Sequence, residues 1–135
     1  MKTLLLDANS IMLLTRVGWI PESGATTAIA AYELGNAVWK ELHLFKRVTE
    51  EESRILLTAF HETMLRLKVE PQLKLSERLE VLSNADRFGI SYYDSSYLTA
   101  AIQLEATLVT EDKGLRNAAE ERGLSTSSAG ELVKT

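Results

Sequence analysis

The chain has 135 residues, the usual length of one domain, and it contains no cysteine, which excludes disulfides, thiolate metal sites and cysteine nucleophiles. Its 19 acidic residues outnumber its 15 Lys and Arg residues, and the net charge is −4, so a role on nucleic acid would need a local basic surface or bound cations. No apolar run approaches the roughly 18 residues of a membrane span, and we expect a soluble, cytoplasmic protein in which residues 1–135 form a single domain.

Short apolar runs and helical periodicity alternate along the first half of the chain. Residues 3–6 are typical of a strand buried on both faces, and Asp7 and Asn9 interrupt the apolar stretch too early for a signal peptide. Thr49 and Glu52 form a Thr-x-x-Glu capping box, which predicts the start of a helix. For this half we predict helices at residues 11–15, 29–42 and 49–67, a loop at 18–24 and a strand at 25–27.

The same alternation continues in the second half. Gly89 follows an amphipathic stretch at the position of a helix C-cap, so a helix at residues 76–88 should end there. We predict strands at 90–93, 106–110 and 125–127, and helices at 95–104, from Asp112 to Arg122, and at 129–133. Strands that alternate with helices favour a parallel sheet covered on both faces, so the expected fold class is α/β.

Four carboxylates fall at equivalent places in this scheme. Asp7, Asp94 and Asp112 each come just after a predicted strand, and Glu33 lies early in the helix at 29–42. The carboxyl ends of parallel strands share one edge of the sheet, where ligands bind. Four clustered carboxylates need protons or cations to neutralise their repulsion, and oxygen ligands suit Mg²⁺ or Mn²⁺. The pattern therefore predicts a divalent-metal site.

A purely structural interpretation fits each of these residues taken singly. Asp is a favoured helix N-cap, and Asp7, Asp94 and Asp112 all precede or begin a predicted helix. Glu33 alone fits a solvated position on a helix. The hypothesis of a metal site therefore depends on all four residues meeting at one edge.

Four stretches of the sequence resemble the PIN-domain nucleases, and most closely the VapC-type toxins of toxin–antitoxin pairs. They are Leu-Leu-Leu-Asp-Ala-Asn-Ser at residues 4–10, Ala-Ala-Tyr-Glu-Leu at 30–34, Gly-Ile-Ser-Tyr-Tyr-Asp-Ser-Ser-Tyr-Leu at 89–98 and Leu-Val-Thr-Glu-Asp-Lys-Gly-Leu at 108–115. The four occur in family order over nearly the whole chain. One departure is the serine pair at 95–96, where the family often has small apolar residues.

The resemblance implies a three-layer α/β/α sandwich with a central parallel sheet of about five strands. It also implies a divalent-metal-dependent endoribonuclease that forms homodimers and is silenced by a cognate antitoxin protein, whose C-terminal segment enters the active-site groove. The residues that match the family's acidic positions are Asp7, Glu33, Asp94 and Asp112. Asn9 and Thr110 match the polar positions that flank the metals.

The chemistry expected from these residues is attack of a metal-bound water on an RNA phosphodiester. Lys40 lies two helical turns beyond Glu33 and is a candidate contact for RNA phosphate, although a lysine also suits a solvated helix end. Two other functions stay open: a non-catalytic PIN module that binds RNA or a protein partner, and a PIN nuclease for RNA processing. A receiver-like domain is disfavoured, because Asp7 has no acidic neighbour.

Overall fold

A computed structural model of the chain describes residues 2–134 and contains a five-stranded, fully parallel sheet. The strand order is β3-β2-β1-β4-β5. The strands are β1 (Leu4–Leu6), β2 (Gly24–Thr27), β3 (Lys68–Glu70), β4 (Thr107–Val109) and β5 (Thr126–Ser127). The chain builds outward from β1 to β3 and then returns to the other side of β1. The strand order therefore reverses between β1 and β4, which is where open parallel sheets bind ligands.

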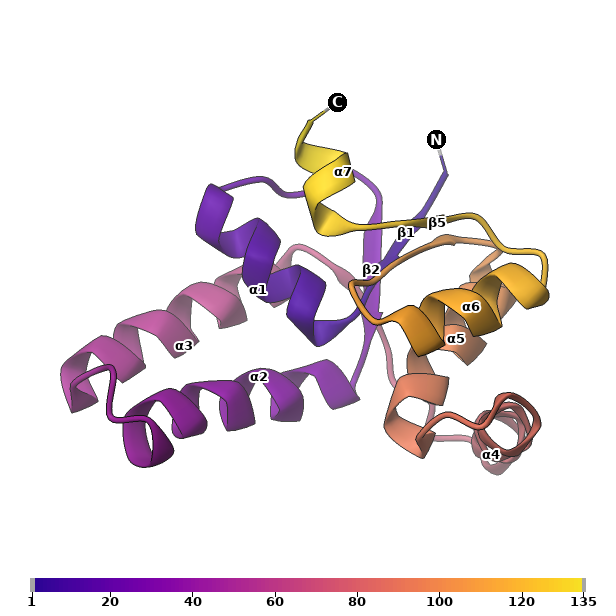
Figure 1. The fold of residues 1–135 in the computed structure, drawn as a ribbon, viewed down its shortest axis with the longest axis horizontal. Helices are drawn as coiled ribbons and strands as arrows, with labels where there is room; N and C mark the ends of the chain where they lie inside the picture. Colours follow the sequence, from indigo (N-terminus) through magenta and orange to yellow (C-terminus); the bar gives the residue numbers. More distant parts are fainter. Residues whose placement is uncertain (1, 135) are drawn as a thin grey trace.

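Helices cover both faces of this sheet (Figure 1). Helices α1, α2 and α3 lie on one side, and α4, α5 and α6 on the other. The helices are α1 (Ala8–Val17), α2 (Ile29–Trp39), α3 (Glu50–Leu65), α4 (Leu75–Phe88), α5 (Tyr92–Leu104), α6 (Lys113–Glu121) and α7 (Ala129–Val133), and a π-helix η1 (Lys40–Leu44) continues α2. This arrangement confirms the three-layer α/β/α fold.

The core lies on both faces of the central strand β1. Leu5 and Leu6 are fully buried, as expected for a strand covered by helices on both sides. On one face α5 packs closely against the sheet, because Ala100 and Ala101 have small side chains. Both residues are fully buried. None of the helices within residues 2–134 has the length and apolar character needed to cross a membrane.

The predicted strand at residues 90–93 is wrong. The Ser91 hydroxyl accepts a hydrogen bond from the backbone N–H of Asp94 at 3.0 Å, and this cap starts α5 at Tyr92. The strand that the sequence did not predict is β3, which pairs with β2 at the edge of the sheet. It is short and polar and has a single apolar residue, Val69, so it carries little of the hydrophobic signal of a buried strand.

Other local predictions are confirmed. Thr49 and Glu52 form the reciprocal hydrogen bonds of a capping box at the start of α3, at 2.9 and 3.1 Å. Gly89 ends α4 with φ of 64°, a left-handed conformation that glycine adopts without the steric cost of a Cβ. The first helix is longer than predicted, because Asp7 caps it and α1 begins at Ala8.

Candidate functional site

Four carboxylates from four separate segments of the chain line one cavity at the carboxyl edge of the sheet. Asp7 directly follows β1, and Asp112 lies three residues beyond β4, the strand next to it. Glu33 projects from the second turn of α2, and Asp94 from the first turn of α5. The cavity has a volume of about 570 Å³. Residues that are distant in sequence thus meet at the point where the strand order reverses.

Asp7 is buried and held at both of its carboxylate oxygens. Its Oδ1 accepts a 2.9 Å hydrogen bond from the backbone N–H of Ser10, which makes it the N-cap of α1. Its Oδ2 accepts a 2.6 Å hydrogen bond from the Thr110 hydroxyl. Burial raises the pKa of Asp7, and the hydrogen bonds from Thr110 and Ser10 only partly oppose this rise. Asp7 is therefore both a helix cap and a member of the cavity wall.

Glu33 is half-buried and is oriented by Tyr97 from the facing helix α5. The Tyr97 hydroxyl donates a hydrogen bond to Oε1 of Glu33, and the Tyr97 side chain is almost fully buried. Burial raises the pKa of Glu33, the hydrogen bond from Tyr97 lowers it, and the nearby carboxylates of Asp94 and Asp7 raise it further. Burial of Tyr97 and its hydrogen bond to Glu33 raise the pKa of Tyr97 strongly, so Tyr97 remains a neutral donor.

The remaining two carboxylates lie nearer the mouth of the cavity. Asp94 is half-buried, and its pKa is raised by burial first and then by the negative charges of Asp112 and Asp7. Asp112 is exposed and caps α6, because its Oδ1 accepts a 2.8 Å hydrogen bond from the backbone N–H of Leu115. The electrostatic repulsion among the carboxylates indicates that the cavity attracts cations.

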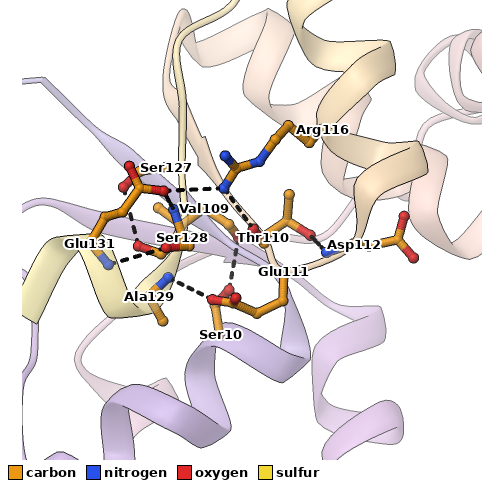
Figure 2. A network of polar contacts seen from close by, with 10 residues as sticks. All are labelled: Ser10, Val109, Thr110, Glu111, Asp112, Arg116, Ser127, Ser128, Ala129 and Glu131. Carbon is orange, nitrogen blue, oxygen red and sulfur yellow. Dashed lines mark hydrogen bonds and ion pairs between the residues drawn. The ribbon is translucent and has the colours of Figure 1, made fainter.

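A polar network attaches the segment from Thr110 to Asp112 to the C-terminal helix α7 (Figure 2). One Glu111 carboxylate oxygen accepts a 2.8 Å hydrogen bond from the backbone N–H of Ala129, the first residue of α7. Arg116 donates to the carbonyl oxygen of Thr110 and to Glu131, in both cases at 3.4 Å. The position of Asp112 in the cavity wall is therefore tied to the packing of α7.

The donors around the cavity fit a hydrated hard cation. The four carboxylates that line the cavity supply oxygen ligands, which suit Mg²⁺ or Mn²⁺. Within residues 2–134, however, no three Asp, Glu, His or Cys side chains converge closely enough to hold one ion by direct contacts alone. Mg²⁺ usually keeps several of its waters and binds through one or two carboxylates. The cavity provides room for such a hydrated ion, with water bridging some of the ligands.

The predicted polar residues take different places around the cavity. Thr110 is fully buried behind Asp7, whereas Asn9 is exposed and lines the cavity. Lys40, at the start of η1, lines the same cavity as Glu33, so the two share one face of the extended helix.

Sequence reasoning missed three tyrosines that line the cavity: Tyr32, Tyr93 and Tyr97. Tyr97 carries a local signal, because it follows Asp94 by three residues and so lies on the same face of a helix. Reading residues 90–93 as a strand concealed that spacing. Tyr32 and Tyr93 are direct neighbours of Glu33 and Asp94 in the sequence.

Comparison with known proteins finds a sequence relative and several similar solved structures. No family model matches the chain. It is 32% identical over 115 residues to the exonuclease VapC9 of Pyrobaculum aerophilum, an alignment that covers 82% of this chain and 81% of that protein. The crystal structure of PAE2754 from Pyrobaculum aerophilum superposes with a TM-score of 0.80 at 27% identity, covering 97% of this chain and 92% of that one. The structure of VapBC-1 from nontypeable Haemophilus influenzae shares the fold, with a TM-score of 0.59 at 19% identity, over 95% and 98% of the two chains.

Proposed function

Since this chain belongs to the VapC family of PIN-domain nucleases, we propose that it is a divalent-metal-dependent endoribonuclease and the toxin of a toxin–antitoxin pair. The observation that carries this proposal is the cavity lined by Asp7, Glu33, Asp94 and Asp112, which come from four separate segments of the chain. A set of unrelated helix caps would have no reason to face one cavity. The shared cavity therefore favours a catalytic centre over the purely structural interpretation.

The protein's own contribution to catalysis is to hold acidic groups in fixed positions. When bound, Mg²⁺ or Mn²⁺ supplies Lewis acidity that neutralises charge on the phosphate and makes water a better nucleophile. Asp7, Asp94 and Asp112 would hold the cation, directly or through water. Glu33 is available to accept a proton from the attacking water, because Tyr97 fixes its carboxylate at the cavity wall.

Polar and basic residues around these carboxylates would support the reaction. Thr110 fixes the orientation of Asp7 through its 2.6 Å hydrogen bond, as residues that orient metal ligands do. Asn9 is exposed at the cavity and can donate to a water or a phosphate oxygen. Lys40 lines the same cavity and would attract an RNA phosphate, which helps an acidic protein to bind a polyanion.

The test is cleavage of total cellular RNA in Mn²⁺, with the new ends mapped by sequencing. Asp94→Asn removes one cavity carboxylate and keeps the size of the side chain. The matched control is Asp86→Asn, which changes an exposed aspartate of α4 that does not line the cavity. We expect discrete cuts with the wild type and Asp86→Asn and none with Asp94→Asn or in EDTA. Cuts that persist with Asp94→Asn, or no cuts by the wild type, would overturn the proposal.

A second activity, exonucleolytic trimming, is suggested by the name of the curated relative, exonuclease VapC9. A circular single-stranded RNA separates the two activities, because it has no end at which an exonuclease can start. An endoribonuclease converts the circle into linear RNA in the presence of Mn²⁺. A protein that degrades only the linear form of the same sequence is an exonuclease.

The proposed partners are a cognate antitoxin, an RNA substrate and a second copy of the chain, and the proposed location is the cytoplasm. Two alternatives stay open: a non-catalytic module that binds RNA or a protein, and a nuclease for RNA processing. Growth arrest on expression of the wild type but not of Asp94→Asn would support the toxin. Normal growth, together with defined trimming of one RNA precursor, would support RNA processing instead.

A further inference from the structure

We propose that a second hollow, beside the carboxylate cavity, is a subsite for an unpaired nucleotide that flanks the phosphate to be cut. We name it the tyrosine subsite. It is formed by Tyr32, Tyr92 and Tyr93 together with Gln72 and Arg78. The proposal rests on the proposed ribonuclease function and adds to it the part of the substrate that this surface would recognise.

The tyrosine subsite is continuous with the acidic cavity. It has a volume of about 250 Å³, and Ile29, Tyr32 and Tyr93 line both hollows. Tyr32 precedes Glu33 on α2, and Tyr93 precedes Asp94 on α5. A strand of RNA whose phosphate lies at the carboxylates would therefore place a neighbouring nucleotide against these two rings.

The two tyrosines that line both hollows are exposed to solvent. Tyr32 is 80% exposed and Tyr93 is 58% exposed. Their rings therefore contribute little to the core, and binding a ligand would remove apolar surface from water. Single-stranded RNA binds proteins largely by stacking its bases on such aromatic side chains, and every base has a face that can stack. An exposed tyrosine pair next to a nuclease centre matches that chemistry.

The subsite also offers a cation for the RNA backbone. Arg78 on α4 is exposed, and its Nε donates a 3.3 Å hydrogen bond to the Tyr92 hydroxyl, which directs the guanidinium toward the subsite. The other guanidinium nitrogens are suited to a phosphate oxygen. This positive charge stands beside a cavity of four carboxylates, so it would help to hold the polyanion on that side.

The amide of Gln72 is held in place at the rim of the subsite. Its Nε2 donates a 2.8 Å hydrogen bond to the carbonyl oxygen of Ser96 on α5. The backbone of Gln72 has a φ of 51°, a left-handed conformation that is costly for a residue other than glycine and that occurs often at functional sites. With the nitrogen engaged, the side-chain oxygen of Gln72 is the group that can accept a hydrogen bond from a base edge.

The test is binding of a fluorescent single-stranded RNA of about 12 nucleotides, a length within the range that one binding groove covers. Fluorescence anisotropy is measured in Ca²⁺ in place of Mn²⁺, and a gel checks that the RNA stays intact. Tyr32→Leu and Tyr93→Leu remove the rings, whereas Tyr32→Phe and Tyr93→Phe keep them and serve as matched controls. Both positions are exposed, and circular dichroism with a melting curve checks that each of the four variants is folded.

We expect each leucine variant to raise Kd about tenfold and each phenylalanine variant to bind within about twofold of the wild type. Arg78→Gln should weaken binding and reduce the slope of log Kd against log salt by about 0.7, the loss of one phosphate contact on a single strand. Arg87→Gln, on the same helix, is the control and should keep the wild-type slope. Wild-type affinity in both leucine variants overturns the subsite. The exposed tyrosines would then be assigned to contact with a protein partner. No binding by the wild type overturns the subsite as well.

Cleavage in Mn²⁺ separates this inference from the proposed function. If the wild type cuts RNA and the leucine variants cut with the same KM at the same positions, the subsite is wrong and the nuclease stands. If the wild type binds RNA through the tyrosines but does not cut it, the ribonuclease is wrong and the subsite stands. A raised KM with an altered set of cut positions in the leucine variants supports both.

Discussion

The Thr110 hydroxyl joins the ends of two neighbouring strands, because it donates a 2.6 Å hydrogen bond to Oδ2 of Asp7. Leu6 and Val109 are register partners in β1 and β4, so the residues that follow them lie side by side. The same hydroxyl oxygen accepts a 3.0 Å hydrogen bond from the backbone N–H of Asp112. One buried side chain thus sets the relative position of two of the four cavity carboxylates.

Replacing Thr110 with valine should affect both stability and metal binding. Valine has the same shape but leaves the buried Asp7 oxygen without its donor, which costs about 1–3 kcal/mol of the free energy of unfolding. Loss of a residue that orients a metal ligand typically lowers metal affinity by about 10–100-fold. Urea unfolding and a Mn²⁺ titration measure the two effects. Thr107→Val, in the strand β4 that precedes Thr110, is the control, and equal effects of the two substitutions would contradict this role for Thr110.

The contact between Tyr97 and Glu33 should appear as a coupling energy. The hydrogen bond joins a buried hydroxyl to a half-buried carboxylate, and bonds to charged groups contribute about 1.5–3 kcal/mol. A double-mutant cycle of Tyr97→Phe and Glu33→Gln, measured by urea unfolding, isolates this contact. We expect the double variant to be less destabilised than the sum of the single variants. Strict additivity would show that the two side chains do not interact.

Asp7 and Asp112 could be placed from the sequence, because a short apolar run before each one marked a strand of a parallel sheet. Asp94 was placed beside the other carboxylates, where the structure has it, but for the wrong reason. Residues 90–93 contain an isoleucine and two tyrosines, which favour a strand. The serine at position 91, three residues before Asp94, carried the competing signal of a helix cap, and in the structure that cap determines the backbone.

The contacts that hold the carboxylates in place could not be predicted from local sequence patterns. Tyr97 and Glu33 are 64 residues apart, so their contact depends on how α5 packs opposite α2. Glu111 accepts a hydrogen bond from the first residue of α7, which is 18 residues away in the sequence. Such contacts arise from tertiary packing, which neither helical periodicity nor capping patterns encode. The tyrosine subsite likewise depends on the missed strand β3, because Gln72 lies in the loop that follows it.

The raised pKa of Asp94 predicts how stability depends on pH without metal. Burial and the charges of Asp112 and Asp7 make Asp94 hold its proton more tightly in the folded chain than in the unfolded chain. Its contribution to stability is therefore fully present below the unfolded pKa of about 3.9 and is lost as pH rises through the folded pKa. In EDTA, the free energy of unfolding of Asp94→Asn should increase relative to that of the wild type as pH rises from the unfolded pKa of Asp94 through its folded pKa. A difference that is constant with pH would contradict the prediction.

The bond from Ala129 to Glu111 should stabilise the attachment of α7. Glu111→Ala removes the acceptor and leaves the first N–H of α7 without this partner. The free energy of unfolding should fall by about 0.5–1.5 kcal/mol. Glu111→Gln keeps an acceptor oxygen and is the matched control. Hydrogen exchange should become faster in α7 in the alanine variant, while α4 on the other side of the sheet stays unchanged. Equal exchange rates in the alanine and glutamine variants would contradict the role of this bond.

The central claim is that the carboxylate cavity binds a divalent cation, and a Mn²⁺ titration followed by calorimetry tests it most directly. Asp94→Asn is compared with Asp86→Asn, which alters an exposed aspartate that does not line the cavity. We predict that the wild type and Asp86→Asn bind Mn²⁺ with the same affinity and that Asp94→Asn binds at least about tenfold more weakly. Binding by Asp94→Asn that equals that of the wild type would contradict the account.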